Sequence, residues 1–226
     1  MSERVMSSLA ERLVQVRERM EAACARAGRP AASVTLVAVS KLKPAALIRE
    51  AYAAGQRDFG ENYAQELRDK AVELADLKDL RWHAIGPLQT NKVKYVAKAA
   101  HAYHALDRLE VAEELSRRRL DAPLPCLVEV NVGGEASKSG LAPERLEEFL
   151  RAVRGLPGLR VEGLMALPPP TEDEQVARGH FRAVRELARR HGLPGLSMGT
   201  THDYALAIEE GATLVRVGTA LFGERG

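Results

Sequence analysis

A lysine follows the first strongly apolar segment of the chain, in the run VTLVAVSKLKP at 34–44. Strand alternation places Val37, Val39 and Lys41 on one face, so Lys41 emerges at the end of a buried strand. Burial disfavours the ammonium form of a lysine, and the free amine can attack a carbonyl to form an imine. We therefore expect Lys41 to be nucleophilic, the alternative being an ordinary solvated lysine. Lys43 lies outside the strand and is the weaker candidate.

Two segments near the C-terminal end combine glycines with hydroxyl side chains, as a phosphate site requires. They read LSMGTTHD at 196–203 and RVGTALFG at 216–223. Glycine permits close backbone approach, hydroxyls donate hydrogen bonds, and a short helix can begin at Thr219. The side chains that can donate are those of Ser197, Thr200, Thr201 and Thr219, and the glycines are Gly199 and Gly218. Ordinary loop and capping material is the alternative interpretation.

An arginine stands inside the last apolar run, LVRVG. Val215 and Val217 flank Arg216, which by strand alternation shares a face with Gly218. A guanidinium directed into a core is costly unless it meets an acceptor such as a carboxylate, a phosphate or a ring nitrogen. We expect either a ligand at Arg216 or a structural ion pair with an inward acid, for which Glu129 is the candidate.

Three further segments place polar side chains directly after apolar runs. They are FGENYAQE at 59–66, WHAIGPLQTNK at 82–92 and VNVGGEASKSG at 130–140. The side chains of interest are Asn62, Tyr63, His83, Gln89, Asn91, Lys92, Asn131, Lys138 and Ser139. Taken singly they fit helix caps, a core histidine and a solvated loop, whereas together they predict one polar rim. His101 and His104 have no third partner, so we expect no metal site.

Composition restricts the class of protein. The 226 residues fit one medium-sized domain, and the formal net charge is only +2 with both signs interspersed. We therefore expect neither a nucleic-acid partner nor membrane association. Cys24 and Cys126 form no ligand pattern and are expected to be reduced, and residues 1–32 lack the apolar core of a signal peptide. These features predict a cytoplasmic protein.

Short apolar runs alternate with helical stretches along the chain. The strand candidates cover 34–40, 57–60, 81–86, 101–106, 125–132, 160–167, 195–199 and 213–218. The helical segments between them include 44–54, 61–77, 109–120, 143–153, 172–190 and 203–210. Apolar strands separated by helices predict a parallel sheet covered on its outer side, and eight such units favour a closed (β/α)8 barrel. An open doubly wound sheet is the competing topology, but no GxGxxG follows the first strand.

The N-terminal segment has the period of an amphipathic helix. Between Ser2 and Arg29, apolar residues recur at steps of three and four, and Gly28 and Pro30 then end the pattern. The apolar positions are Val5, Leu9, Leu13, Val16, Met20 and Ala23. This extra helix has two open placements, the bottom of the barrel or an interface with a second chain, and we expect a monomer.

Seven ordered segments resemble the pyridoxal phosphate (PLP) homeostasis family along nearly the whole chain. They are LVAVSKLKP, DFGENYAQE, WHAIGPLQTNK, EVNVGGEASKSG, GLMAL, LSMG and LVRVGTALFG. The resemblance implies one α/β domain over residues 1–226, a (β/α)8 TIM barrel similar to the N-terminal domain of alanine racemase, which is a PLP enzyme of fold type III. It further implies a non-catalytic PLP carrier that balances the vitamin B6 pool, with PLP-dependent apo-enzymes as recipients.

The same resemblance assigns roles to residues. It implies that PLP is held as a Schiff base, the internal aldimine, on Lys41. Ser197, Gly218 and Thr219 are then expected around the phosphate, and Arg216 near the pyridine nitrogen. A cation at that nitrogen opposes its protonation and weakens PLP as an electron sink, which favours holding over turnover.

Further positions follow from the resemblance. Asn62 and Met165 are expected close to the ring, and Lys138 is expected to handle or release PLP. The chain departs from the family in SMGTTHD, because members commonly read SMGMS there. Thr200 and Thr201 replace Met and Ser at these positions, and the hydroxyl capacity of the segment is retained.

Two other functions compete with a carrier. The first is a PLP-dependent amino-acid racemase of low activity. Related barrel enzymes take their second acid or base from a tyrosine in a C-terminal domain that this chain lacks, and no motif recommends Tyr63 or Tyr204 as a substitute. The second is a sugar-phosphate isomerase without PLP, whose carboxylate base would come from Glu61, Glu129 or Glu135.

Overall fold

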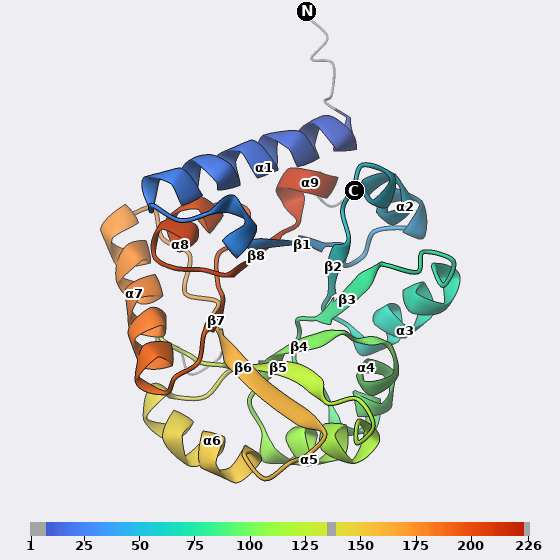
Figure 1. Ribbon diagram of the computed structural model, residues 1–226, viewed down its shortest axis with the longest axis vertical. Helices are drawn as coiled ribbons and strands as arrows, with labels where there is room; N and C mark the ends of the chain where they lie inside the picture. The colour runs from blue at the N-terminus through green and yellow to red at the C-terminus, as the bar shows by residue number, and fades with distance from the viewer. Residues whose placement is uncertain (1–7, 135–138, 224–226) are drawn as a thin grey trace, which may run out of the picture.

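Eight parallel strands close into a barrel in chain order, β1 to β8, in the computed structural model, which describes residues 8–134 and 139–223 (Figure 1). The strands are β1 (Thr35–Val39), β2 (Asp58–Glu61), β3 (Arg81–Ala84), β4 (Ala102–Leu106), β5 (Leu124–Glu129), β6 (Leu159–Met165), β7 (Gly195–Ser197) and β8 (Leu214–Val217). Each strand candidate from the sequence is confirmed. Because β1 pairs with both β2 and β8, the open doubly wound alternative is wrong.

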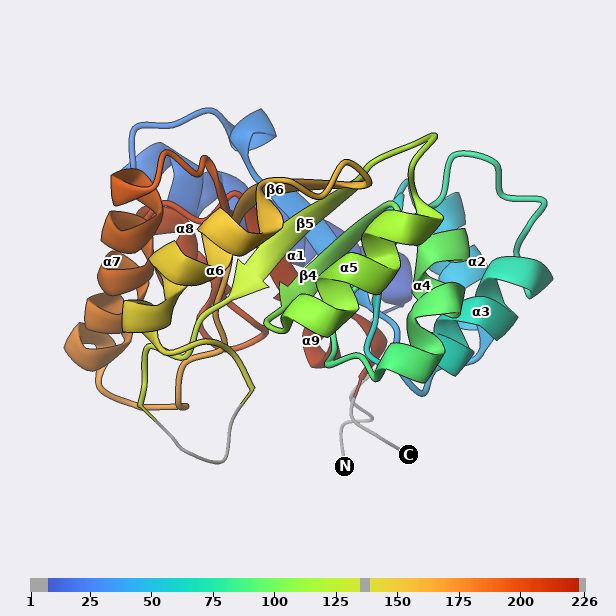
Figure 2. The ribbon, with the colours of Figure 1, turned by 90° about the horizontal axis from the view of Figure 1, so that it is seen from below.

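A helix follows each strand and covers the outside of the barrel (Figures 1 and 2). In chain order these are α2 (Ala45–Ala53), α3 (Ala64–Glu73), α4 (Val93–Ala99), α5 (Leu109–Arg118), α6 (Leu146–Val153), α7 (Glu174–Arg190), α8 (Tyr204–Glu209) and α9 (Thr219–Phe222). Short 3-10 helices occur at η1 (Ala31–Ser33), η2 (Thr90–Lys92) and η3 (Pro143–Arg145). The turn expected to begin at Thr219 is α9.

The N-terminal helix α1 (Leu9–Arg26) completes the ring of helices between α8 and α2 (Figure 1). Its first turn is fixed by a capping box, in which the Ser8 hydroxyl accepts from the Glu11 amide and the Glu11 carboxylate accepts from the Ser8 amide. Its apolar face is buried against α8, α9 and α2. The expected placement at the bottom of the barrel is wrong, because α1 lies against the side of the barrel, over the one-turn α9. An interface between α1 and a second chain stays a prediction.

Two facing glycines allow β6 and β7 to approach closely. Gly163 pairs with Gly195, and a Cβ atom on Gly163 would lie 2.1 Å from the Gly195 carbonyl oxygen. Any side chain at this position would therefore force the two backbones apart. The contrast is Gly179, an exposed residue inside α7 whose added Cβ would meet nothing within 4 Å.

We predict opposite effects of alanine at these two glycines. Gly163→Ala is expected to lower the free energy of unfolding by about 3 kcal/mol through overpacking. Gly179→Ala is expected to raise it by roughly 0.5–1 kcal/mol, because alanine loses less backbone entropy in a helix. Urea unfolding of both variants measures the difference, and equal stabilities would contradict the close approach of β6 and β7.

The amino-terminal ends of β2 and β3 are joined by an ion pair. Arg81 donates to Asp58 through Nη2 to Oδ2 at 2.6 Å and through Nε to Oδ1 at 2.9 Å. His83 Nε2 lies 2.9 Å from the same Oδ1. Although burial raises it, the hydrogen bonds from Arg81 and His83 hold the pKa of Asp58 at about 2.

This lowered pKa predicts part of the acid sensitivity of the fold. Since the carboxyl titrates near 3.8 when unperturbed, its stabilisation is complete above that pH and is lost as the pH falls toward 2. Asp58→Asn should flatten this part of the stability profile by about 2 kcal/mol. Urea unfolding between acid and neutral pH measures it, with the exposed Asp121→Asn as control. If the free energy of unfolding of Asp58→Asn falls at acid pH as much as that of the parent protein, Asp58 is not the source of this acid sensitivity.

Candidate functional site

A cavity of about 470 Å³ opens at the carboxyl ends of the strands, and we call it the rim cavity. Its wall is built from the ends of β1, β2, β3, β5, β6, β7 and β8 and the loops that follow them. Its volume falls in the range of small-molecule sites. Six of the seven residues that the resemblance placed around PLP line it, namely Lys41, Asn62, Met165, Arg216, Gly218 and Thr219. Lys138 lies outside the described residues.

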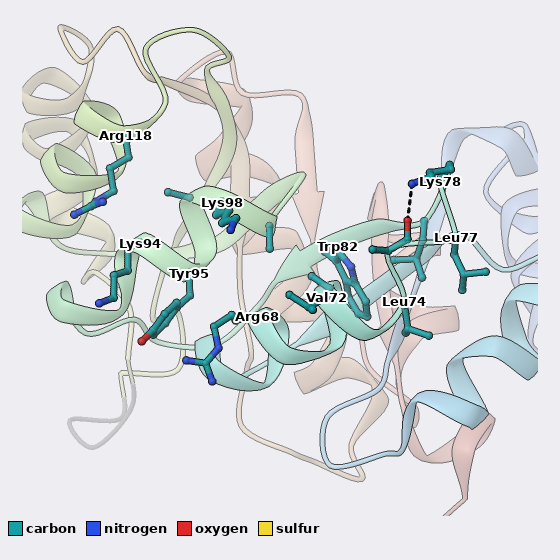
Figure 3. Close-up of a pocket in the computed structure, with 15 residues that line it drawn as sticks. Arg68, Val72, Leu74, Leu77, Lys78, Trp82, Lys94, Tyr95, Lys98 and Arg118 are labelled. Atoms are coloured by element: carbon teal, nitrogen blue, oxygen red, sulfur yellow. Dashed lines mark hydrogen bonds between the residues drawn. The ribbon is translucent and has the colours of Figure 1, made fainter.

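A larger hollow of about 930 Å³ lies on the outside of the barrel between α3 and α4 (Figure 3). Its floor is apolar, with Leu74, Leu77 and Trp82, and Arg68 and Lys94 stand at its edge. The described residues that line it include no carboxylate, histidine, cysteine, serine or threonine. The rim cavity, by contrast, is lined by a carboxylate, a histidine, a serine and threonines.

Lys41 lies in a tight turn directly after β1. The Ser40 carbonyl accepts from the Lys43 amide at 3.1 Å, which closes the turn. Leu42 has a φ of 59°, a left-handed conformation that costs a non-glycine residue about 1–2 kcal/mol. Its amide donates to the Glu66 carboxylate at 2.6 Å, which helps to hold this conformation. The turn directs Lys41 to the rim cavity and leaves Leu42 exposed.

A buried ion cluster holds the Lys41 turn from below. Lys70 Nζ in α3 lies 2.7 Å from each of three oxygens, which are Glu61 Oε1, Glu66 Oε1 and the Ser40 carbonyl. The Ser40 hydroxyl donates to Glu61 Oε1 at 2.6 Å. Burial raises the pKa of Glu61 to about 7 even though Lys70 opposes the shift. The backbone on both sides of Lys41 is therefore tied to β2 and α3.

Arg216 lies at the floor of the rim cavity, buried in β8. Nη1 donates to the Ser197 hydroxyl at 2.6 Å, and Nη2 donates to the Ala166 carbonyl at 3.0 Å. Among the described residues no carboxylate forms an ion pair with this guanidinium, so the alternative of a structural ion pair with Glu129 is wrong. Burial lowers the pKa of Arg216 to about 10, with Glu129 opposing, and the group remains a cation at neutral pH.

The loop after β7 presents its hydroxyl groups unequally. Gly199 has a φ of 93° and carries the chain from β7 into this loop. The Asp203 carboxylate accepts from the Thr200 amide at 2.7 Å and from the Thr200 hydroxyl at 3.3 Å. The Thr201 hydroxyl accepts from the Ala220 amide at 3.5 Å and keeps its own proton for another acceptor. Both threonines line the rim cavity, but Thr201 is the better placed donor.

Ser197 does not line the rim cavity. It is fully buried beneath Arg216, and its hydroxyl also lies 2.8 Å from His104 Nδ1. The hydroxyl that was expected at a phosphate therefore supports Arg216, and Thr201 in the following loop occupies the cavity wall. This division cannot be read from a segment in which serine and threonine are equally plausible donors.

Other candidates divide between the rim cavity and the rest of the barrel. Asn131 and Ser139 line the cavity, whereas His83 and His104 lie in the barrel interior. Tyr63 is 54% exposed and does not line the cavity. The other candidates that the cavity does not bring together are Gln89, Asn91, Lys92 and Tyr204. The expected polar rim is therefore only partly present.

Three lining residues were missed or undervalued by the sequence analysis. Gly86 follows β3, and a Cβ atom on it would lie 2.3 Å from the Asn62 carbonyl, so glycine lets these two loops meet. The Gly-Pro pair at 86–87 was the available signal. Glu129 lines the cavity with its pKa raised to about 7, chiefly by burial and then by Asp107. His202 also lines the cavity.

The ion cluster generates a stability prediction. Lys70→Met leaves two carboxylates without their cation, so we expect the free energy of unfolding to fall by about 3 kcal/mol. Amide exchange at Leu42 should accelerate, because the turn loses its support. The double variant Lys70→Met/Glu61→Gln should recover part of the loss, since one unpaired charge is removed. A double variant no more stable than Lys70→Met would contradict the coupling.

The described ranges, 8–134 and 139–223, have neither a cluster of metal-ligating side chains nor a helix suited to a membrane. They contain no group of three or more histidine, cysteine, aspartate or glutamate residues that could hold a metal ion. No helix within them combines the length and apolar character needed to cross a membrane.

Known proteins resemble this chain along nearly its whole length. Residues 12–226 match the family described as alanine racemase, N-terminal domain. The pyridoxal phosphate homeostasis protein of Pseudomonas aeruginosa is 51% identical, covering 97% of this chain and 97% of that protein. The protein of the same name from Aquifex aeolicus is 47% identical, covering 95% of this chain and 97% of that protein.

Solved structures share the barrel. PipY of Synechococcus elongatus, in a structure with PLP bound, is 38% identical with a TM-score of 0.84, covering 96% of this chain and 100% of that chain. Alanine racemase from Corynebacterium glutamicum is 17% identical with a TM-score of 0.62, covering 93% of this chain and 60% of that chain. The likeness to the racemase concerns the fold alone.

Proposed function

Because the chain belongs to the pyridoxal phosphate homeostasis proteins, which share the alanine racemase N-terminal domain, we propose that it binds PLP in the rim cavity and supplies it to other proteins. One observation carries the proposal: a lysine amine, a buried guanidinium and threonine hydroxyls line a single cavity of ligand size. The PLP bound in PipY supports it. We further propose that residues 1–226 act as one PLP-binding domain, as a monomer in the cytoplasm.

The donor set fits the groups that PLP offers. Lys41 supplies an amine for the aldehyde, and Thr201 and Thr219 supply hydroxyls for the phosphate. Gly218 lies beside the same wall, where an added Cβ would approach the Val39 carbonyl to 3.3 Å. A glycine keeps this wall open for a close ligand. Arg216 would face the ring nitrogen from the cavity floor.

Asn62 and Met165, at the ends of β2 and β6, line the cavity and would flank the ring. Ser197 would act through Arg216 and not on the phosphate. We keep Lys138 as a group that assists release, on the strength of the resemblance alone.

The surroundings favour holding PLP over turning over an amino acid. PLP supplies an aldehyde that an amine can attack and a ring that withdraws electrons when its nitrogen is protonated. Arg216, a cation fixed by two hydrogen bonds, opposes that protonation. Among the described residues that line the cavity none is a tyrosine, and the Tyr204 ring contacts Arg19 of α1 instead. We therefore propose a carrier with PLP-dependent apo-enzymes as recipients.

A low racemase activity is the second candidate, and Glu129 is the observation that favours it. Its carboxyl lines the same cavity as Lys41, and its pKa of about 7 allows it to carry a proton at neutral pH. Lys41 and Glu129 would then form the acid and base pair that racemisation requires.

Loading with PLP tests the first proposal. We expect purified protein to turn yellow with PLP, and borohydride reduction followed by peptide mass analysis to place the label on Lys41. Lys41→Ala should take up no label, because it removes the amine. Lys43→Arg, which retains a cation in the same turn, is the matched control and should be labelled normally. Protein that stays colourless, or a label on another lysine, would overturn the assignment.

Two further measurements distinguish a PLP carrier from a racemase. Holo-protein should restore activity to an unrelated PLP-dependent apo-enzyme, and Lys41→Ala incubated with PLP and desalted should not. With single-enantiomer alanine, a carrier yields no detectable opposite enantiomer. Formation of that enantiomer in the parent protein, lost in Glu129→Gln, would establish the racemase instead.

A further inference from the structure

A chain of hydrogen bonds crosses the barrel interior from Arg216 to the amino-terminal rim. Arg216 Nη1 meets the Ser197 hydroxyl at 2.6 Å, which in turn lies 2.8 Å from His104 Nδ1. His104 Nε2 lies 2.9 Å from His83 Nδ1, and His83 Nε2 lies 2.9 Å from Asp58 Oδ1. The path passes from β8 through β7, β4 and β3 to β2, and so connects opposite ends of the barrel.

This chain of hydrogen bonds lies in the barrel interior, where barrels of this class place apolar side chains. Ser197 and His104 are fully buried, and His83 and Asp58 are 6% and 8% exposed. The two imidazole rings meet edge to face, with centroids 5.0 Å apart. Polar groups at this depth destabilise a fold unless each finds a partner, so the continuity of the chain is a requirement.

The donor and the acceptor of every hydrogen bond follow from the two groups at the ends of the network, Arg216 and Asp58. Arg216 can only donate, so the Ser197 hydroxyl accepts from it and sends its own proton to His104 Nδ1. With Nδ1 as acceptor, a neutral His104 carries its proton on Nε2 and donates to His83 Nδ1. His83 then carries its proton on Nε2 and donates to the Asp58 carboxylate, which can only accept.

The opposite direction leaves a buried group unsatisfied. If His83 carried protons on both nitrogens, His104 would accept at Nε2 and donate from Nδ1 to the Ser197 hydroxyl. Ser197 would then receive two donors, and its own proton would have no acceptor in a fully buried site. Burial also lowers the pKa of His104 and favours its neutral form. One arrangement therefore satisfies every member.

We propose that Asp58, His83, His104 and Ser197 are positioning residues that fix the Arg216 guanidinium at the floor of the rim cavity through this directed chain. Nη1 is committed to Ser197 and Nη2 to Ala166, which sets the plane of the guanidinium and the N–H groups left for a ligand. The functional part of the proposal rests on PLP binding, since the ring nitrogen is the acceptor that an oriented Arg216 would meet.

The tautomers of His83 and His104 test the proposed directions of these hydrogen bonds without any ligand. Long-range nitrogen–proton NMR of the unliganded protein distinguishes the two neutral tautomers, and His83→Gln and His104→Gln assign their signals among the six histidines. At neutral pH we expect both rings neutral with the proton on Nε2. A charged ring, or His104 with its proton on Nδ1, would overturn the proposal.

A substitution of Asp58, at the amino-terminal rim, should change the tautomer of His104. Asp58→Val removes the acceptor of His83, so that each direction of the hydrogen bonds then leaves one group unsatisfied. The His104 signals should therefore move from a pure Nε2 tautomer toward a mixture of the two tautomers. Asp58→Asn retains an acceptor oxygen and should leave both tautomers as in the parent protein. A purely structural Asp58 would alter stability in these variants without changing the His104 tautomer, and that result would also overturn the proposal.

PLP affinity tests the effect on Arg216 and does not depend on Asp58→Val folding. Ser197→Ala should raise the dissociation constant about tenfold, which corresponds to about 1.4 kcal/mol. Ser197→Thr should restore most of the affinity, and His191→Gln, at the end of α7, is the control outside the chain. Parent affinity in Ser197→Ala would show that Arg216 needs no positioning. If the parent protein binds no PLP, the proposed function is wrong. The histidine tautomers then still show whether the hydrogen bonds from Arg216 to Asp58 have the proposed directions.

Discussion

The pairing of β1 with β8 is the constraint on which the structure depends. Val37 lies opposite Arg216 in the register of these two strands, although they stand near opposite ends of the sequence. Closure therefore brings Lys41, which follows β1, beside the glycine and threonines that follow β8 and β7. Without this pairing the amine and the guanidinium would belong to separate edges of an open sheet, and no cavity would exist between them.

Much of the fold and part of the site could be predicted because both depend on local patterns. Strand alternation and the rule that barrel chemistry lies at the carboxyl rim were enough to place Lys41, Arg216 and Thr219 together. Ser197 escaped the same reasoning, because its partners come from β8 and β4, and alternation says which way a side chain points but not what it meets. The location of α1 likewise depends on contacts with α8, α9 and α2, which no pattern within α1 reports.

The polar groups beneath the rim explain why the remaining features were invisible in the sequence. Lys70 lies in a helix rich in charges, where it looks like one more solvated cation, yet it is buried against Glu61 and Ser40. His83 and His104 are spaced along the chain like unrelated core residues, and only barrel closure makes them neighbours. Such networks specify a single arrangement because each member has a defined donor or acceptor role.

Barrel closure also has a consequence for the order in which the protein matures. During translation β1 emerges early, but one of its two edges stays unpaired until β8 has left the ribosome. An open strand edge is a template for association with other chains, so the nascent protein carries that risk from the synthesis of β1 until that of β8. The emergence of β8 thus determines the moment at which the newly made chain can close this strand edge and form the cavity that would hold a ligand.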